Sequence, residues 1–147
     1  MCGSLACMTD ITALLPHREP FLFLDRIEKA DKEEIVGYRR FTDSDFFFRG
    51  HFPKYPVVPG VILIESLAQC GGAGVRMVTG NPGIFFLAAL EKAKFRRQVK
   101  PGEEVRMVIT NLRVSKAMVR QSGKAYVGDE LAVEAEWLAL IGEAPVA

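Results

Sequence analysis

The chain contains the stretch Arg49-Gly-His-Phe-Pro-Lys-Tyr-Pro-Val-Val-Pro-Gly-Val-Ile-Leu-Ile-Glu-Ser-Leu-Ala-Gln69, in which a loop leads into a long apolar segment. Three prolines and two glycines fall within residues 50–60, too many for a helix or a paired strand. The run from Val61 to Val78 has no proline and is apolar nearly all round, which predicts a helix buried inside the fold. Pro59 suits the first helical position, because its missing N–H would be unpaired there anyway.

The same apolar run also has nearly the length of a membrane span, which needs about 20 apolar residues. Glu65 and Gln69 interrupt it, and so do three glycines, at positions 71, 72 and 74. The chain on either side is polar and resembles strands. We therefore expect a buried helix and no membrane span.

Three features of this stretch favour chemistry at the carbon next to a carbonyl group. Glu65 is the only charged side chain between positions 54 and 76, and a carboxylate buried alone tends to keep its proton and serve as a general acid. His51 is one of two histidines, and histidine is the side chain best suited to act as a base near pH 7. The helix start at Gly60 and Val61 offers unpaired N–H groups that bind a developing oxyanion.

Each feature also has a purely structural interpretation. A loop histidine is often structural or solvated, a glutamate in an apolar helix is often paired with a distant Arg or Lys, and the prolines indicate only a tight loop. The combination of base, amides and acid favours a catalytic site. Because a helix rises about 1.5 Å per residue, Glu65 lies roughly 8 Å from the helix start, and all three groups are expected to line one pocket.

Three motifs follow one another along nearly the whole chain, from Ile11 to Ile141. They are Leu15-Pro16-His17-Arg18 with Pro20-Phe21-Leu22 and Asp25-Arg26, then Gly50-His51-Phe52-Pro53 with Pro56, Pro59-Gly60, Glu65 and Ala68-Gln69, then Lys92-Ala93-Lys94-Phe95-Arg96 with Val99 and Pro101-Gly102. Together they resemble the FabZ type of 3-hydroxyacyl-[acyl carrier protein] dehydratases. The chain departs from that pattern at Glu19, where the family often has an aromatic residue.

The resemblance implies an α+β hotdog fold, in which an antiparallel β-sheet wraps around a long central α-helix. It implies dehydration of 3-hydroxyacyl-acyl carrier protein to trans-2-enoyl-acyl carrier protein in fatty acid biosynthesis, with no metal and no organic cofactor. It also implies a homodimer, with a trimer of dimers as a further assembly. In that dimer His51 comes from one subunit and Glu65 from the other.

The expected mechanism gives each site residue a role. The N–H of Gly60, with Val61 beside it, binds the thioester oxygen and draws charge from the α-carbon. His51 removes the α-proton, and protonated Glu65 gives its proton to the departing hydroxyl. Gln69 lies one turn beyond Glu65 and is expected to orient it. Further substrate contacts are expected from Phe52 and Phe86.

The second histidine, His17, is expected to have a structural role, because nothing near it in the sequence supplies an acid or an activated amide. Residues 92–100 contain five basic side chains and no acidic one. They favour docking of an acidic carrier protein, although an exposed strand face followed by a turn would account for three of them. The five are Lys92, Lys94, Arg96, Arg97 and Lys100.

Composition predicts one globular domain. The chain has 147 residues, of which 49% are hydrophobic and 25% charged, and its net charge of +1 gives no reason to expect nucleic acid as a partner. Three cysteines do not make a disulfide framework, so a reducing cytoplasm is the simplest location. Residues 1–9 are expected to be a disordered leader, and residues 10–147 a single hotdog dehydratase domain.

Strands are expected at residues 21–27, 34–42, 84–90, 105–115, 118–127 and 131–137, with a bulge between 109 and 112 and an interruption at Ser122-Gly123. The sequence lacks a phosphate loop, a CxxC pair and a GxSxG nucleophile turn. Three other functions remain open. They are a hotdog acyl thioesterase, a dehydratase that also isomerises the double bond, and a non-catalytic acyl-binding hotdog protein.

Overall fold

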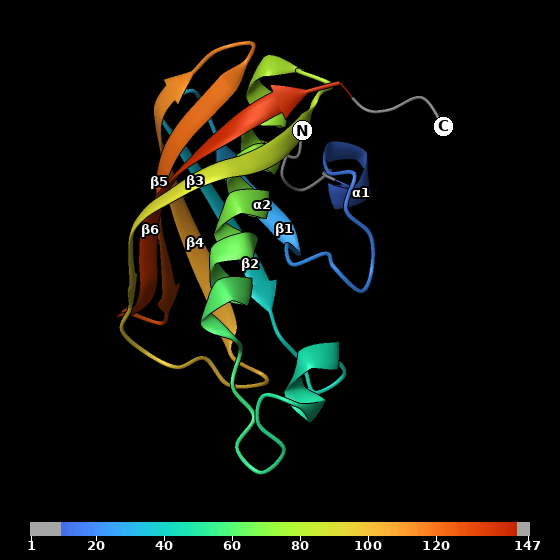
Figure 1. The fold of residues 1–147 in the computed structure, drawn as a ribbon, viewed down its shortest axis with the longest axis vertical. Helices are drawn as coiled ribbons and strands as arrows, with labels where there is room; N and C mark the ends of the chain where they lie inside the picture. The colour runs from blue at the N-terminus through green and yellow to red at the C-terminus, as the bar shows by residue number, and fades with distance from the viewer. Residues whose placement is uncertain (1–9, 144–147) are drawn as a thin grey trace.

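A computed structural model describes residues 10–143, so the predicted leader at residues 1–9 lies outside the described residues. Two helices, a 3₁₀ turn and six strands follow one another along this part of the chain (Figure 1). They are α1 (Ile11–Leu14), β1 (Arg26–Ala30), β2 (Glu34–Arg40), η2 (Phe46–Arg49), α2 (Gly60–Thr79), β3 (Ile84–Phe95), β4 (Glu104–Val114), β5 (Met118–Val127) and β6 (Glu130–Gly142).

The six strands form one antiparallel sheet in the order β1-β2-β4-β5-β6-β3, which leaves β1 and β3 at the two edges. The sheet curves around α2, and every strand contacts this helix (Figure 1). This is the hotdog fold that the sequence predicts. The segment with η2 and the loop that follows it lie beyond the N-terminal end of α2, outside the layered core (Figure 1).

Helix α2 forms the centre of the core. Its buried positions include Leu67, Cys70 and Ala73, none of which exposes any surface. By length and composition α2 is apolar enough to cross a membrane, but 67% of its apolar window is buried inside the fold, as in the core helix of a soluble protein. Pro59 is the N-cap rather than the first residue, and the helix ends at Gly80, whose φ of 70° favours glycine.

Two strand predictions are corrected by the structure. Residues 21–25 do not belong to β1. The N–H of Phe23 donates to the Gln69 side chain of α2 and its carbonyl accepts from Ser66, whereas the N–H of Asp25 donates to the Tyr38 carbonyl of β2. Strand β5 runs unbroken through Gly123, where a Cβ would lie 2.5 Å from the Trp137 ring, so glycine serves close packing rather than a break. The bulge predicted in β4 is confirmed by a register shift between Asn111 and Arg113.

Candidate active site

The His51 loop is held by backbone hydrogen bonds. The N–H of His51 donates to the carbonyl of Phe47 in η2 at 2.9 Å, and the His51 carbonyl accepts from the N–H of Val57 at 3.0 Å. Val57 and Val58 are buried, and the N–H of Val58 donates to Val99 at 2.7 Å. The loop thus has buried attachments at both ends, while the side chains of its tip are exposed.

The same loop decides which nitrogen of His51 is available as a base. Nδ1 lies 3.0 Å from the carbonyl oxygen of Val57. A carbonyl only accepts hydrogen bonds, so Nδ1 carries the proton and Nε2 presents a lone pair. The ring of Phe52, which is half exposed, stacks on the imidazole with ring centroids 4.2 Å apart. His51 therefore has the tautomer that a general base needs.

One pocket joins His51 to the start of α2. It is lined by His51, Phe52, Gly60, Val61, Phe95 and Arg97, among others. The first helical hydrogen bonds come from Ile62 and Leu63, so the N–H groups of Gly60 and Val61 precede the ladder. A Cβ on Gly60 would lie 2.5 Å from the ring of Phe95, so the glycine lets this ring pack against the helix start. Among residues 10–143 neither N–H donates a hydrogen bond, so a base and two amides outside the helical ladder share this pocket.

Glu65 lies in a second pocket, where Gln69 fixes its carboxyl group. The amide nitrogen of Gln69 donates to Oε2 of Glu65 at 2.9 Å, as its position one turn along the helix predicts. The same amide accepts from Phe23 N–H at 2.7 Å and donates to the Phe21 carbonyl at 3.2 Å. Because Gln69 is only 2% exposed and these bonds engage its amide, it acts as a support for Glu65.

His17 also reaches Glu65, which the sequence analysis missed. Its Nε2 lies 3.5 Å from Oε2 of Glu65, and both side chains are half buried. Burial lowers the pKa of His17, the Glu65 carboxylate raises it, and Arg18 adds to the lowering. The two residues are far apart in sequence, so only the packing of α1 and the following turn against α2 brings them together. The Leu15-Pro16-His17-Arg18 motif was the one available signal.

Within one chain the two pockets have no lining residue in common. The Glu65 pocket is lined by His17, Glu65, Ala68, Phe86, Leu87 and Trp137, among others. A single chain therefore does not place the helix start, His51 and Glu65 in one pocket. The rise along the helix gives only the distance of Glu65 from the helix start, not the face on which its side chain lies. At about 100° per residue, Glu65 lies roughly 140° around the helix from Gly60. Phe86 is half exposed beside Glu65 rather than beside His51.

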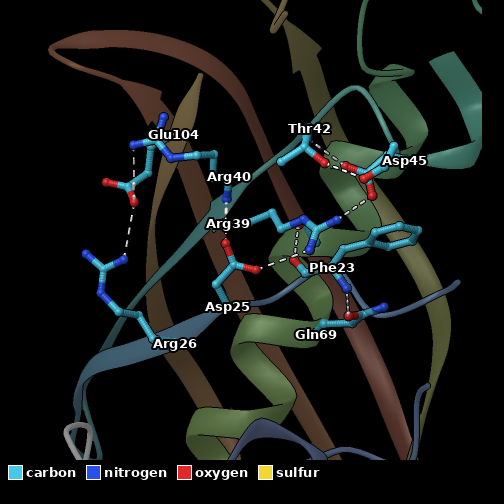
Figure 2. A network of polar contacts seen from close by, with 11 residues as sticks. Phe23, Asp25, Arg26, Arg39, Arg40, Thr42, Asp45, Gln69 and Glu104 are labelled. Carbon is cyan, nitrogen blue, oxygen red and sulfur yellow. Dashed lines mark hydrogen bonds and ion pairs between the residues drawn. The ribbon is translucent and has the colours of Figure 1, made fainter. Parts of the chain in front are cut away.

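A buried arginine ties the segment that leads to His51 to the sheet. Arg39 of β2 donates to Asp25 at 3.1 Å and to Asp45 at 2.6 Å, and its side chain is 11% exposed (Figure 2). Asp45 also accepts from the N–H of Thr42 and immediately precedes η2. The guanidinium group lies 4.9 Å from the centre of the Phe41 ring. Arg39 thus anchors the turn whose Phe47 carbonyl receives the His51 N–H.

The basic stretch is partly neutralised. Lys92 lies 3.5 Å from Glu136, Arg96 lies 2.8 Å from Glu134, and Arg97 forms two hydrogen bonds with Glu103, which lower the pKa of that carboxyl group. Among residues 10–143, no ion pair involves Lys94 or Lys100. Three of the five basic residues are thus engaged by carboxylates of the same chain. Arg96 and Arg97 also line the His51 pocket, which keeps the stretch beside the candidate site.

The described part of the chain contains no group of three or more His, Cys, Asp or Glu side chains that could hold a metal ion. The paired carboxylates Asp25 and Asp45 are engaged by Arg39. The candidate groups described above are an imidazole, a carboxyl group and backbone amides. In one chain these groups are divided between two pockets.

Known proteins resemble the chain over most of its length. A family model for a FabA-like domain matches residues 15–136. The chain is 43% identical to 3-hydroxyacyl-[acyl-carrier-protein] dehydratase FabZ of Desulforamulus reducens over 141 residues, which cover 92% of this chain and 99% of the relative. It is 45% identical to FabZ of Koribacter versatilis over 131 residues, covering 87% and 84%.

Solved structures share the architecture. The dehydratase heterocomplex ApeI:P from Xenorhabdus doucetiae matches with a TM-score of 0.76 at 14% identity, covering 92% of both chains. Zebrafish thioesterase superfamily member 2 matches with a TM-score of 0.61 at 12% identity, covering 80% of both. At such low identity this likeness concerns the fold alone, which dehydratases and thioesterases have in common.

Proposed function

Because the chain belongs to the family of FabZ-type 3-hydroxyacyl-[acyl-carrier-protein] dehydratases, hydro-lyases of fatty acid biosynthesis, we propose that His51 and Glu65 from two copies form each of its active sites. The observation that carries this proposal is the division of base and acid between two pockets of one chain. A site that contains both His51 and Glu65 then requires the Glu65 pocket of one copy to face the His51 pocket of another.

Strand β3 supports such an arrangement. It is a 12-residue edge strand with half-exposed apolar side chains, which include Phe86, Leu87, Leu90 and Phe95. A long apolar edge strand is a template for pairing with another chain. The beginning of β3 lines the Glu65 pocket, whereas its end at Phe95 lines the His51 pocket. Antiparallel pairing of two copies of β3 about a two-fold axis therefore brings the two kinds of pocket together twice.

In this composite site the thioester oxygen of a 3-hydroxyacyl chain accepts a hydrogen bond from the N–H of Gly60. That bond stabilises the negative charge that develops when the α-proton leaves. His51 takes this proton on Nε2, the nitrogen that its bond to Val57 leaves unprotonated. Glu65 of the second copy gives its proton to the departing 3-hydroxyl group, which leaves as water. The C–O bond breaks as the trans-2 double bond forms.

After one dehydration His51 carries an extra proton and Glu65 is ionised. Proton exchange with solvent returns both to their starting states, and hydration of the enoyl product uses the same groups with exchanged roles. The acyl chain is expected to contact Phe52 on the His51 side and Phe86 on the Glu65 side. Both side chains are half exposed in a single copy.

The name of the relatives indicates a substrate carried on acyl carrier protein. We propose that this partner docks on the basic stretch beside the His51 pocket. Lys94 and Lys100 are available for an acidic surface, and Arg96 and Arg97 lie at the pocket itself. Charge complementarity of this kind mainly accelerates encounter and weakens with added salt.

A subunit-mixing assay tests the composite site. The absorbance of the enoyl thioester is followed during hydration of a crotonyl substrate, for wild type, His51→Ala and Glu65→Ala. Each variant alone should lose about 10²–10⁴-fold in kcat, the usual contribution of one proton-transfer group. A mixture of the two after verified subunit exchange should regain activity, because one of the two sites in a mixed dimer has both groups.

Three results would count against the proposal. Mixed dimers without recovered activity would exclude a site shared between copies. Release of free thiol without enoyl chemistry would identify a thioesterase instead. Binding of acyl ligands without any turnover would leave the third alternative, a non-catalytic acyl-binding protein.

A further inference from the structure

We infer that His17 is a positioning residue which, together with Gln69, engages Oε2 of Glu65 and leaves Oε1 as the oxygen that transfers the proton. This inference rests on the proposed function, since it concerns the acid of that reaction. It gives a role to the second histidine, which the mechanism does not otherwise use.

The orientation of Gln69 follows from its backbone partner. The N–H of Phe23 is a donor, so the side-chain oxygen of Gln69 must face it, at 2.7 Å. The NH₂ group consequently points the other way, toward Oε2 of Glu65 at 2.9 Å and the Phe21 carbonyl at 3.2 Å. A flipped amide would set two donors against each other at Phe23. Oε2 of Glu65 therefore always meets a donor from this side.

His17 approaches the same oxygen from another element. Its Nε2 lies 3.5 Å from Oε2, while its Nδ1 is buried without a hydrogen-bond partner among the described residues. A proton on Nδ1 would thus be buried without an acceptor, whereas a proton on Nε2 faces a carboxyl oxygen. Burial lowers the pKa of the ring, which favours a neutral imidazole with a single proton. The geometry places that proton on Nε2.

Gln69 therefore donates a hydrogen bond to Oε2, and Nε2 of His17 lies 3.5 Å from the same oxygen. No hydrogen bond among residues 10–143 involves Oε1, so this oxygen is free to hold the proton that goes to the departing hydroxyl. When the proton leaves, the new negative charge is stabilised at Oε2 by both donors. The separation of 3.5 Å is long for a hydrogen bond, and catalytic contacts commonly tighten only when substrate is bound.

Three variants of His17 separate this role from packing. Glutamine places its amide nitrogen near the position of Nε2, whereas asparagine reaches only the position of Nδ1. We expect His17→Ala and His17→Asn to lower kcat roughly 10-fold to 100-fold, the effect of a misplaced catalytic group, with KM changed less than about twofold. His17→Gln should recover most of the lost kcat. Melting temperatures of all three show whether the fold is intact.

Subunit mixing then assigns His17 to one half of the site. His17 and Glu65 lie in the same chain and the same pocket. His17→Ala mixed with His51→Ala should therefore form one fully wild-type site per dimer and regain wild-type-like turnover at that site. His17→Ala mixed with Glu65→Ala forms no wild-type site, and its activity should not exceed that expected from the His17→Ala sites.

The inference is overturned if His17→Ala keeps its kcat, or if Asn restores activity as well as Gln does. It is also overturned if lost activity follows only the fraction of unfolded protein. Failure of the proposed function looks different, because His51→Ala and Glu65→Ala would then not complement each other at all. Complementation of that pair with an unaffected His17→Ala enzyme would reject the role of His17 alone.

Discussion

The His51 pocket and the Glu65 pocket hold their reactive groups in different ways. His51 stands on a loop, and a backbone carbonyl, that of Val57, decides which ring nitrogen is free. Glu65 stands within a rigid helix, and the side chains of Gln69 and His17 decide which oxygen is free. A substitution in the loop can disturb the base without touching the acid. Conversely, the side chains of Gln69 and His17 orient the acid without contact to the base.

This difference bears on the proposal that a single chain is incomplete. Each pocket holds one of the two proposed reactive groups together with the groups that orient it, but neither contains both His51 and Glu65. The two pockets touch opposite ends of β3, the exposed edge of the sheet. In the proposed composite site, assembly of two copies is the step that brings base and acid together. Disturbing assembly, the loop support and the acid support should therefore have separable consequences.

The largest effect is expected when the two pockets are separated. Leu90 lies near the middle of β3 and is 46% exposed, so Leu90→Lys is compatible with the fold of one chain. A buried lysine at paired β3 edges would oppose association. We expect analytical ultracentrifugation to show a smaller assembly for this variant than for the wild-type protein. Crotonyl hydration should fall by about 10²–10⁴-fold, because each base loses its acid.

Leu112→Lys is the matched control. Leu112 is 48% exposed, but it lies in β4, away from the β3 edge. It should retain both the assembly and the activity. An active, fully associated Leu90→Lys protein would show that the pockets do not meet across β3.

An intermediate effect is expected when the support of the His51 loop is removed. Arg39→Met leaves Asp25 and Asp45 without their shared partner, and Asp45 is 12% exposed. Breaking a buried pair in this way costs about 3 kcal/mol of unfolding free energy. Urea unfolding measures this cost, and hydrogen exchange should show faster opening at residues 45–57 than along α2.

Arg26→Met serves as the comparison for Arg39. Arg26 pairs with Glu104 at 3.2 Å in the same region, but half of its side chain is exposed (Figure 2). Exposed ion pairs of this kind contribute at most about 1 kcal/mol to the free energy of unfolding. Equal losses of unfolding free energy in Arg39→Met and Arg26→Met would mean that the Arg39 network supports the loop no better than a surface ion pair does.

Local signals explain what the sequence predicted well. The proline-free apolar run from Val61 to Val78 lies within α2, and the bulge in β4 follows from the slip in its alternating pattern. The segment 21–25 was wrongly predicted as a strand, because its partners are Ser66 and Gln69 on a distant helix. No local pattern specifies a backbone that bonds to side chains far along the chain.

The candidate site shows the same limit. His51, Gly60 and Gln69 were identified from residue type and spacing, since each depends on its neighbours along the chain. The support from His17 was missed because it depends on tertiary packing. The division into two pockets was missed in the spacing argument, because rise along a helix does not report the face on which a side chain lies. The family resemblance, by contrast, already implied a shared site.

The smallest expected effect is a pH dependence of stability that belongs to the Glu65 pocket. Burial lowers the pKa of His17 below its ordinary value of about 6.5. The unfolded chain then binds a proton on His17 at a higher pH than the folded chain does. Folding is therefore undisturbed by this group above about pH 6.5, and stability falls as the pH drops below that value.

His17→Gln removes the titrating ring while keeping an amide near Oε2. Its urea midpoint should consequently fall less than that of wild type between about pH 7 and pH 5.5. Carboxyl groups whose pKa is lowered, such as that of Glu103, lose their stabilising effect only below about pH 4.5, outside this window. Equal falls in both proteins would show that the His17 ring is no harder to protonate when folded. The contrast between a support that titrates beside Glu65 and a backbone support beside His51 would then disappear.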